Sequence, residues 1–180
     1  FVMINPITAE QYAIQQNDLV KVKSRRGAVQ VIADISSDIR PEHIFVPLHW
    51  NDQYSSNARV DSLVAPFFDP VSGQPEFKHT PAKIEKCDVV DWASIVTAKP
   101  INCGGFLYWH KSHLKQGTGY VYQVATDAEF NWSVFIDEHT ANNNITPITS
   151  EQFNNPMDRD QRFICYTNDA IEIAIYSHSR

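Results

Sequence analysis

The chain has 180 residues, of which 43% are hydrophobic and 20% are charged, so its composition supports a packed core rather than disorder. Its 15 basic and 21 acidic residues leave a net charge of −6, which argues against binding to nucleic acid or to an anionic membrane, because both need a basic surface. No apolar run approaches the about 18 residues of a membrane-spanning helix. Three scattered cysteines do not make a disulfide scaffold, which favours a reducing compartment.

The chain opens on an apolar run, residues 1–4, that starts with Phe and lacks the basic and apolar regions of a signal peptide. We therefore expect a piece of a longer protein, which would carry part of a site and no complete activity. Thr8 followed three residues later by Gln11 is a capping-box pattern, and it predicts a helix from Thr8 to about Gln16.

A β-hairpin is predicted next. Apolar and polar side chains alternate over most of residues 19–24, and residues 28–35 form a second apolar run. Arg25-Arg26-Gly27 would form the turn between them, with Gly27 available for a positive φ.

Two further strands are expected, at residues 43–46 and 79–86. Between them, residues 48–78 show no periodicity and contain three prolines. This stretch is rich in aromatic side chains, whereas disordered segments are poor in them. It is therefore interpreted as an ordered binding loop.

The second half of the chain is also rich in strand patterns, although residues 88–98 are ambiguous between helix and strand. The strands expected here should form a sheet with its own core. The predicted segments are strands at 106–110, 120–125 and 132–136, a polar loop at 141–144, and a terminal hairpin of 162–167 with 170–176.

Cys103, His110 and His113 together resemble the three protein ligands of a catalytic zinc site. On a strand, however, the two histidines would point to opposite faces, so a buried thiol and two strand-end imidazoles are the better interpretation. Cys87, beside Lys86, is expected at the tail of a strand, where a structural role is the better interpretation. Three cysteines cannot hold an iron–sulfur cluster. We therefore predict no metal site and no complete active site in this chain.

The loop before residue 79 carries side chains that suit a flat heterocycle with a phosphate tail. His49 and Trp50 can stack on a ring, Asn51 can pair with its polar edge, and Lys78 can neutralise a phosphate, with Asp61 as a further polar contact. The alternative is that His49 and Trp50 are core side chains and that Lys78 is solvated. Composition alone favours that alternative.

Several segments add a more specific signal through their order and spacing. They are Ile4-Asn5-Pro6, residues 18–27, Phe45-Val46-Pro47-Leu48-His49-Trp50, residues 69–79 and residues 82–85. With these segments, residues 4–86 resemble the C-terminal cofactor-binding domain of molybdopterin-dependent oxidoreductases of the dimethyl sulfoxide reductase superfamily. The Ser-Arg-Arg-Gly turn and the His-Trp pair are most similar to the assimilatory nitrate reductase catalytic subunit.

The resemblance implies a mainly β fold. Residues 1–87 would form a double-psi β-barrel with short helices, which binds bis-molybdopterin guanine dinucleotide with its molybdenum. Residues 88–180 would form a β-rich α+β extension of unknown role. Asp61 stands where the family usually has an asparagine. The cofactor-binding residues so expected are Leu48, His49, Trp50, Asn51, Asp61 and Lys78.

In the full-length enzyme, the resemblance implies reduction of nitrate to nitrite for nitrate assimilation, in the cytoplasm. The molybdenum ligand and the substrate pocket would lie upstream of Phe1, so the fragment alone would be inactive. The expected partners are the upstream domains of the same enzyme and an electron-donor protein or subunit, with no nucleic acid and no membrane. The alternatives are a domain of a formate dehydrogenase alpha subunit and a non-enzymatic β-barrel interaction module.

Overall fold

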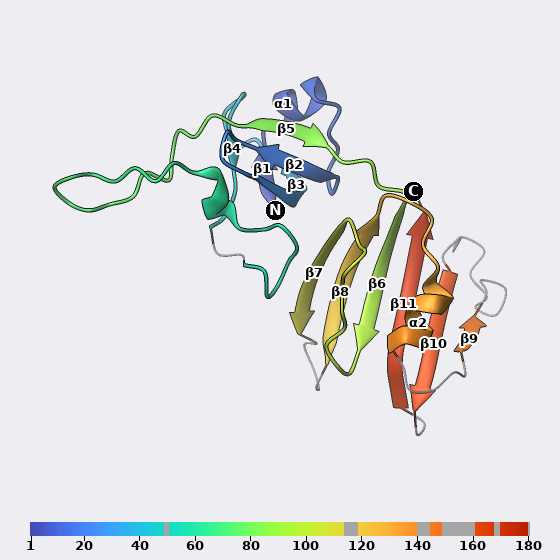
Figure 1. Cartoon of the computed structure of the whole chain (residues 1–180). Helices are drawn as coiled ribbons and strands as arrows, with labels where there is room; N and C mark the ends of the chain where they lie inside the picture. The colour runs from blue at the N-terminus through green and yellow to red at the C-terminus, as the bar shows by residue number, and fades with distance from the viewer. Residues whose placement is uncertain (49–50, 114–118, 140–144, 149–160, 168–169, 180) are drawn as a thin grey trace. The chain divides into compact units, whose positions relative to one another are not determined.

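The computed structural model describes residues 1–48, 51–113, 119–139, 145–148, 161–167 and 170–179 (Figure 1). The chain divides into two compact units, Phe1–Asp88 (unit 1) and Val89–Arg180 (unit 2), each with its own sheet and hydrophobic core. The chain is mainly β with short helices, which confirms the predicted fold class at this level. Within the described part of the chain, no helix has the length and hydropathy of a membrane span.

Unit 1 consists of five strands, a short α-helix and one turn of 3-10 helix: β1 (Val2–Ile4), α1 (Pro6–Gln11), β2 (Leu19–Lys23), β3 (Ala28–Ile35), β4 (Ile44–Phe45), η1 (Val60–Leu63) and β5 (Lys83–Lys86). The strands lie in the order β4-β1-β3-β2-β5. β1 is parallel to β3, and the other pairs are antiparallel. The first strand therefore lies inside the sheet, between β4 and β3.

The β2–β3 hairpin confirms the sequence prediction. Val20 pairs with Val31 and Val22 with Val29, and all four are buried in the core of unit 1. Gly27 does not adopt the expected positive φ. A Cβ at Gly27 would lie 2.8 Å from the backbone oxygen of Ser62, so this glycine is needed for the close approach of η1 to the turn.

The first helix differs from its prediction. α1 begins at Pro6, after Asn5, whose side chain accepts a hydrogen bond from the N–H of Ile7 at 2.9 Å, and it ends at Gln11. Asn5 as N-cap and Pro at the first helical position start the helix, so the predicted start at Thr8 is wrong. The expected extension to Gln16 is also wrong. The strands predicted at 43–46 and 79–86 shorten to β4 and β5.

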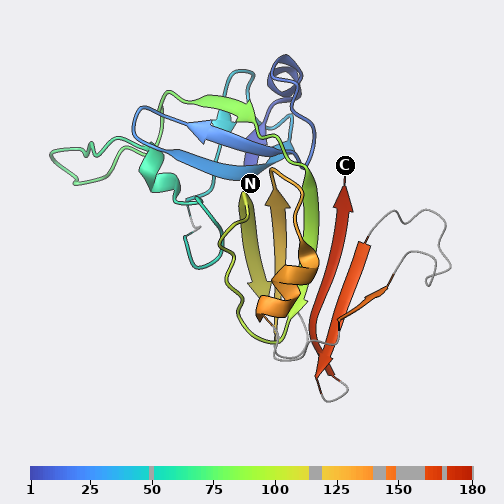
Figure 2. The ribbon, with the colours of Figure 1, turned by 45° about the vertical axis from the view of Figure 1, so that its right-hand side comes forward.

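The described residues of unit 2 form a six-stranded antiparallel sheet with one α-helix: β6 (Asp91–Thr97), β7 (Tyr108–His113), β8 (Tyr120–Thr126), α2 (Trp132–His139), β9 (Ile145–Ile148), β10 (Gln161–Thr167) and β11 (Ala170–Ser179). The order is β7-β8-β6-β11-β10-β9. Figure 2 shows α2 lying across one face of this sheet. The predicted sheet with its own core is confirmed, and residues 88–98 contain β6. The polar loop expected at 141–144 lies outside the described residues.

The strand predicted at 132–136 is wrong, because these residues belong to α2. Trp132, Phe135 and Ile136 have helical spacing, and all three are buried in the core of unit 2. The side chain of Asn131 accepts a hydrogen bond from the N–H of Val134 at 3.1 Å, as an N-cap does. An apolar run of five residues fits a helix as well as a strand, and Asn131 was the signal that separated the two.

Candidate functional site

A cavity of about 1030 Å³ opens in unit 1 between α1, β4 with the segment after it, η1 and the segment leading into β5. Much of its lining is apolar, and this part includes Val22, Ile44, Val60, Leu63 and Ile84. The volume is at the upper end of the range for small-molecule sites, so the cavity has room for a ligand with several rings.

Charged and polar side chains also line this cavity. Lys78 brings an ammonium group, and His43 and His79 bring two imidazoles that can donate hydrogen bonds. Glu42 brings one carboxylate. All four residues are exposed, so they lie where the cavity meets solvent. An apolar lining with cationic and hydrogen-bonding groups at the opening suits a ring system that carries phosphate.

The structure brings two of the predicted site residues to this cavity and leaves two away from it. Leu48 and Lys78 line it. Asn51 and Asp61 are not part of its lining. Asp61 belongs to η1, where it is exposed and its backbone oxygen accepts a hydrogen bond from the N–H of Val64 at 3.3 Å. His49 and Trp50 lie outside the described residues.

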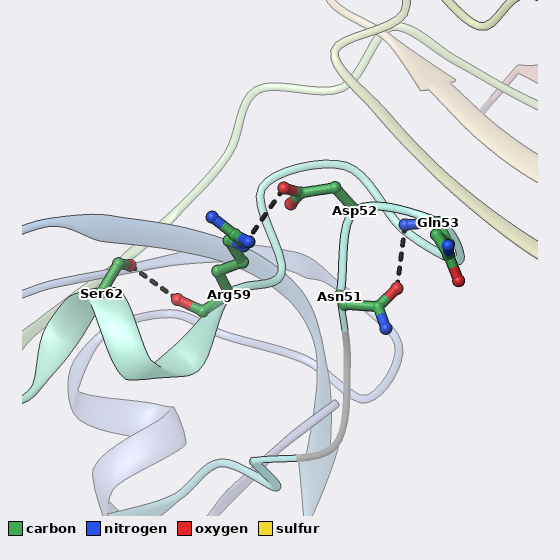
Figure 3. Close-up of polar contacts among 5 residues, drawn as sticks. All are labelled: Asn51, Asp52, Gln53, Arg59 and Ser62. Atoms are coloured by element: carbon green, nitrogen blue, oxygen red, sulfur yellow. Dashed lines mark hydrogen bonds and ion pairs between the residues drawn. The ribbon is translucent and has the colours of Figure 1, made fainter.

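Asn51 begins an ordered turn that reaches η1 (Figure 3). Its side-chain oxygen accepts a hydrogen bond from the N–H of Gln53 at 2.9 Å. Asp52 pairs with Arg59 at 3.2 Å, and the hydroxyl of Ser62 donates to the backbone oxygen of Arg59 at 2.6 Å. The ion pair is about two-thirds exposed and contributes about 0–1 kcal/mol. The geometry of Asn51 therefore indicates a local structural role.

The sequence analysis missed the wall of the cavity that α1 provides. Thr8, Gln11 and Tyr12 line it, as does His43. The hydroxyl of Thr8 accepts a hydrogen bond from the N–H of Glu42 at 2.8 Å, which ties this wall to the residues before β4. The two partners are 34 positions apart, and no local pattern in the sequence indicates such a contact.

Unit 2 does not assemble the three side chains considered for zinc. The ring of His113 lies 5.1 Å from that of Tyr120, whereas the ring of His110 lies 5.9 Å from that of Tyr108. Cys103 is buried, and burial raises the pKa of its thiol to about 12. Over the described residues, no group of three or more histidine, cysteine or acidic side chains is placed to hold a metal ion.

A known family matches the part of the chain that forms most of the cavity. Residues 1–81 match the family model described as "Molydopterin dinucleotide binding domain". A nitrate reductase of Klebsiella oxytoca is 32% identical over 110 residues, which are 61% of this chain and 13% of that protein. The assimilatory nitrate reductase catalytic subunit of Bacillus subtilis is 38% identical over 78 residues, 43% of this chain and 10% of that protein. An F420-dependent formate dehydrogenase 1 subunit alpha of Methanococcus maripaludis is 37% identical over 86 residues, 48% and 12% of the two chains.

The matched parts therefore span only about a tenth of the length of these relatives. The residues at the cavity fit the ligand that the family description names. The volume of the cavity accommodates a dinucleotide-sized molecule, the apolar lining can take flat rings, and Lys78 can face a phosphate. Residues 1–81, which form most of the cavity wall, therefore match the molybdopterin dinucleotide-binding domain family.

Proposed function

We propose that this chain is the C-terminal cofactor-binding part of a molybdenum-containing nitrate reductase, and that bis-molybdopterin guanine dinucleotide lies against the cavity of unit 1. The observation that carries the proposal is the overlap between the family match and the cavity. The matched residues 1–81 include α1, β4, η1 and Lys78, which are most of its wall. When bound, the cofactor supplies the two-electron chemistry that converts nitrate to nitrite.

Each wall of the cavity has a role in this proposal. The ammonium group of Lys78 neutralises a phosphate of the dinucleotide, and His43 and His79 donate hydrogen bonds beside it. Leu48 and the apolar lining exclude water from the flat rings. Contacts from His49, Trp50, Asn51 and Asp61 stay predictions.

The proposal also concerns the rest of the enzyme. We infer that the strands of unit 1 belong to a double-psi β-barrel and that other domains of a longer polypeptide hold the remaining cofactor contacts. The isolated chain is then inactive. Unit 2 covers the barrel or docks an electron-donor protein. The free thiols of Cys87 and Cys103 suit a cytoplasmic enzyme of nitrate assimilation.

The substrate is tested with the full-length enzyme. Formate dehydrogenases match over a similar length and at similar identity, so they define the competing function. We expect the purified enzyme to oxidise reduced methyl viologen when nitrate is added and not to reduce benzyl viologen with formate. The opposite pair of results would assign the chain to a formate dehydrogenase. A gene without additional coding sequence upstream would instead support the interaction module.

Lys78 gives the test of the cofactor site. Removing a hydrogen bond to a charged group weakens binding by about 1.5–3 kcal/mol, or about 10- to 150-fold. In the full-length enzyme, Lys78→Ala should therefore lower the molybdenum and guanine nucleotide content while the circular dichroism spectrum stays unchanged. Lys83→Ala is the matched control, because Lys83 is an exposed lysine on β5 that does not line the cavity. Equal cofactor content in the two variants would remove Lys78 from the site.

A further inference from the structure

An exposed arm, residues 66–79, extends from unit 1 between η1 and β5. Every residue in this segment is exposed. Figure 1 shows the arm as the long loop that projects away from the five-stranded sheet, and Figure 2 shows the same projection from another side. We refer to residues 66–79 as the aromatic arm.

The aromatic arm presents large apolar side chains to solvent. Phe67 is 66% exposed, Phe68 67%, Val71 94% and Phe77 48%. Single exposed apolar residues are normal on a protein surface, but a group of this size on one short segment marks an interaction site.

The stem of the arm is an ordered hairpin. The N–H of Glu76 donates a hydrogen bond to the backbone oxygen of Phe67 at 2.9 Å, and Phe68 forms an isolated antiparallel bridge with Pro75. The rings of Phe67 and Phe68 are thus attached to a fixed backbone. A surface that is ordered before binding loses less conformational entropy when it docks.

The tip of the arm is also fixed. The carboxylate of Asp69 accepts hydrogen bonds from the N–H groups of Val71 at 2.9 Å and Ser72 at 2.6 Å, and from the hydroxyl of Ser72 at 2.9 Å. Gly73, at φ +69°, donates to the backbone oxygen of Asp69 at 2.8 Å, and Asp69 donates to that of Gln74 at 2.8 Å. These bonds hold Val71 at the end of a defined turn.

The apolar area of the arm is large enough for one side of a stable interface. Three partly exposed phenylalanines and one valine offer about 500 Å², and a stable interface buries about 800 Å² on each partner, of which a little more than half is apolar. A segment of the same polypeptide has an advantage over a separate protein, because the covalent connection gives it a high effective concentration. The covalent connection therefore favours an intramolecular occupant.

The relatives and the cavity indicate where that occupant lies. The family match ends at residue 81 and so includes the whole arm. The matched parts of two nitrate reductases are only 13% and 10% of those proteins, which leaves a long polypeptide outside the matched part. Phe77, Lys78 and His79, at the base of the arm, also line the cavity of unit 1. Because the base of the arm lines the cavity, a segment that covers the arm also lies next to the cofactor site.

We propose that the aromatic arm docks into an apolar groove formed by the preceding part of the same full-length polypeptide, and that this contact closes one side of the cofactor cavity. The inference rests on the proposed function, because it needs a longer enzyme in which unit 1 is the C-terminal cofactor-binding part. The arm then joins the halves of the cofactor site without contacting the reacting atoms.

Photo-crosslinking in the full-length enzyme tests this proposal. Val71 is replaced by p-benzoylphenylalanine, because it is the most exposed of the four apolar side chains. We expect irradiation to give a product of unchanged molecular mass, in which peptide mass spectrometry finds residue 71 linked to a segment preceding Phe1. The same replacement at Val134, which is 50% exposed on α2, is the control for random collisions.

Every other outcome overturns the proposal. A covalent dimer would assign the arm to a second copy, and a link within residues 1–180 would assign it to this chain. A yield no higher than that of the Val134 control would show an arm that stays exposed. Molybdenum content, measured on these samples and on the unsubstituted enzyme, separates failure of this proposal from failure of the proposed function. Normal molybdenum content without the expected link refutes the docking of the arm alone, whereas an unsubstituted enzyme that holds no molybdenum refutes the proposed function.

Discussion

The ion pair between Asp18 and Lys86 is predicted to be asymmetric, so that loss of the exposed partner destabilises unit 1 more than neutralisation of the buried one. The side chain of Asp18 is 1% exposed and that of Lys86 is 44% exposed, and their charged atoms are 2.8 Å apart. The same carboxylate oxygen of Asp18 accepts a hydrogen bond from the N–H of Gln15 at 2.7 Å. The pair joins the start of β2 to the end of β5.

The magnitudes follow from what each substitution leaves behind. Lys86→Met leaves the buried carboxylate of Asp18 without its cation. The expected loss of unfolding free energy is about 3 kcal/mol. This value is at the lower end of the range for broken buried ion pairs, because the N–H of Gln15 still donates to the carboxylate. Asp18→Asn keeps an acceptor for Gln15 and releases Lys86 to water. The expected loss of unfolding free energy in Asp18→Asn is the difference between a charged and a neutral hydrogen bond, about 1 kcal/mol. The double variant should recover much of the loss seen in Lys86→Met.

Urea unfolding of the 180-residue chain measures these differences, with hydrogen exchange of peptides from β2 and β3 as the readout for unit 1. A double-mutant cycle then gives the coupling energy between the two side chains. A larger loss for Asp18→Asn than for Lys86→Met would refute the reasoning. So would single losses that add within about 0.5 kcal/mol.

Three further predictions concern other parts of the chain. Gly27→Ala should destabilise unit 1 by about 1–3 kcal/mol in urea unfolding, because its Cβ would lie 2.8 Å from the backbone oxygen of Ser62, and an unchanged midpoint would contradict this close approach. At pH 8, iodoacetamide should modify Cys103 about 1000-fold more slowly in the folded chain than in urea, because burial raises the pKa of this thiol to about 12. Unit 2 should also lose stability as the pH rises above about 9, where the thiol of the unfolded chain ionises and that of the folded chain does not. Equal rates of iodoacetamide modification in the folded chain and in urea would contradict both effects. Hydrogen bonds from Ser72 lower the pKa of Asp69, so the turn of the arm should persist below pH 3.8 and weaken only as the pH falls through the lowered value. An NMR titration of the carboxyl checks this, and Ser72→Ala should move the pKa back towards 3.8.

The parts of the fold that the sequence predicted are those set by neighbouring residues. The alternation in residues 19–23 and the turn at 24–27 were enough for the β2–β3 hairpin, because side chains that are close in sequence determine both. The helix α2 was missed because the run at 132–136 is too short to separate a period of 2 from one of 3.6. The parallel pairing of β1 with β3 has no local signal either, since Val2 meets Ala33 across more than thirty residues.

In the candidate site too, the sequence predicted what neighbouring residues determine and missed what contacts between distant residues determine. Lys78 and Leu48, which line the cavity, stand in motifs that can be recognised along the chain. The wall formed by Thr8 and Tyr12 was missed because long-range contacts, such as that between Thr8 and Glu42, bring these residues to the cavity. Asn51 has a side chain suited to ligand binding, but the neighbouring N–H of Gln53 already uses its oxygen.

The position of β11 in the centre of its sheet has a consequence for folding during synthesis. Ile95 of β6 pairs with Tyr122 of β8 on one side and with Ile175 of β11 on the other. At about 5–20 residues per second, the ribosome needs about 4–16 s to add the 80 residues that separate Ile95 from Ile175. During that interval β6, β7 and β8 can already associate, while the second edge of β6 has unpaired backbone groups. A nascent chain at this stage offers a strand edge to neighbouring chains on the same polysome, so aggregation competes with folding until β11 has been made.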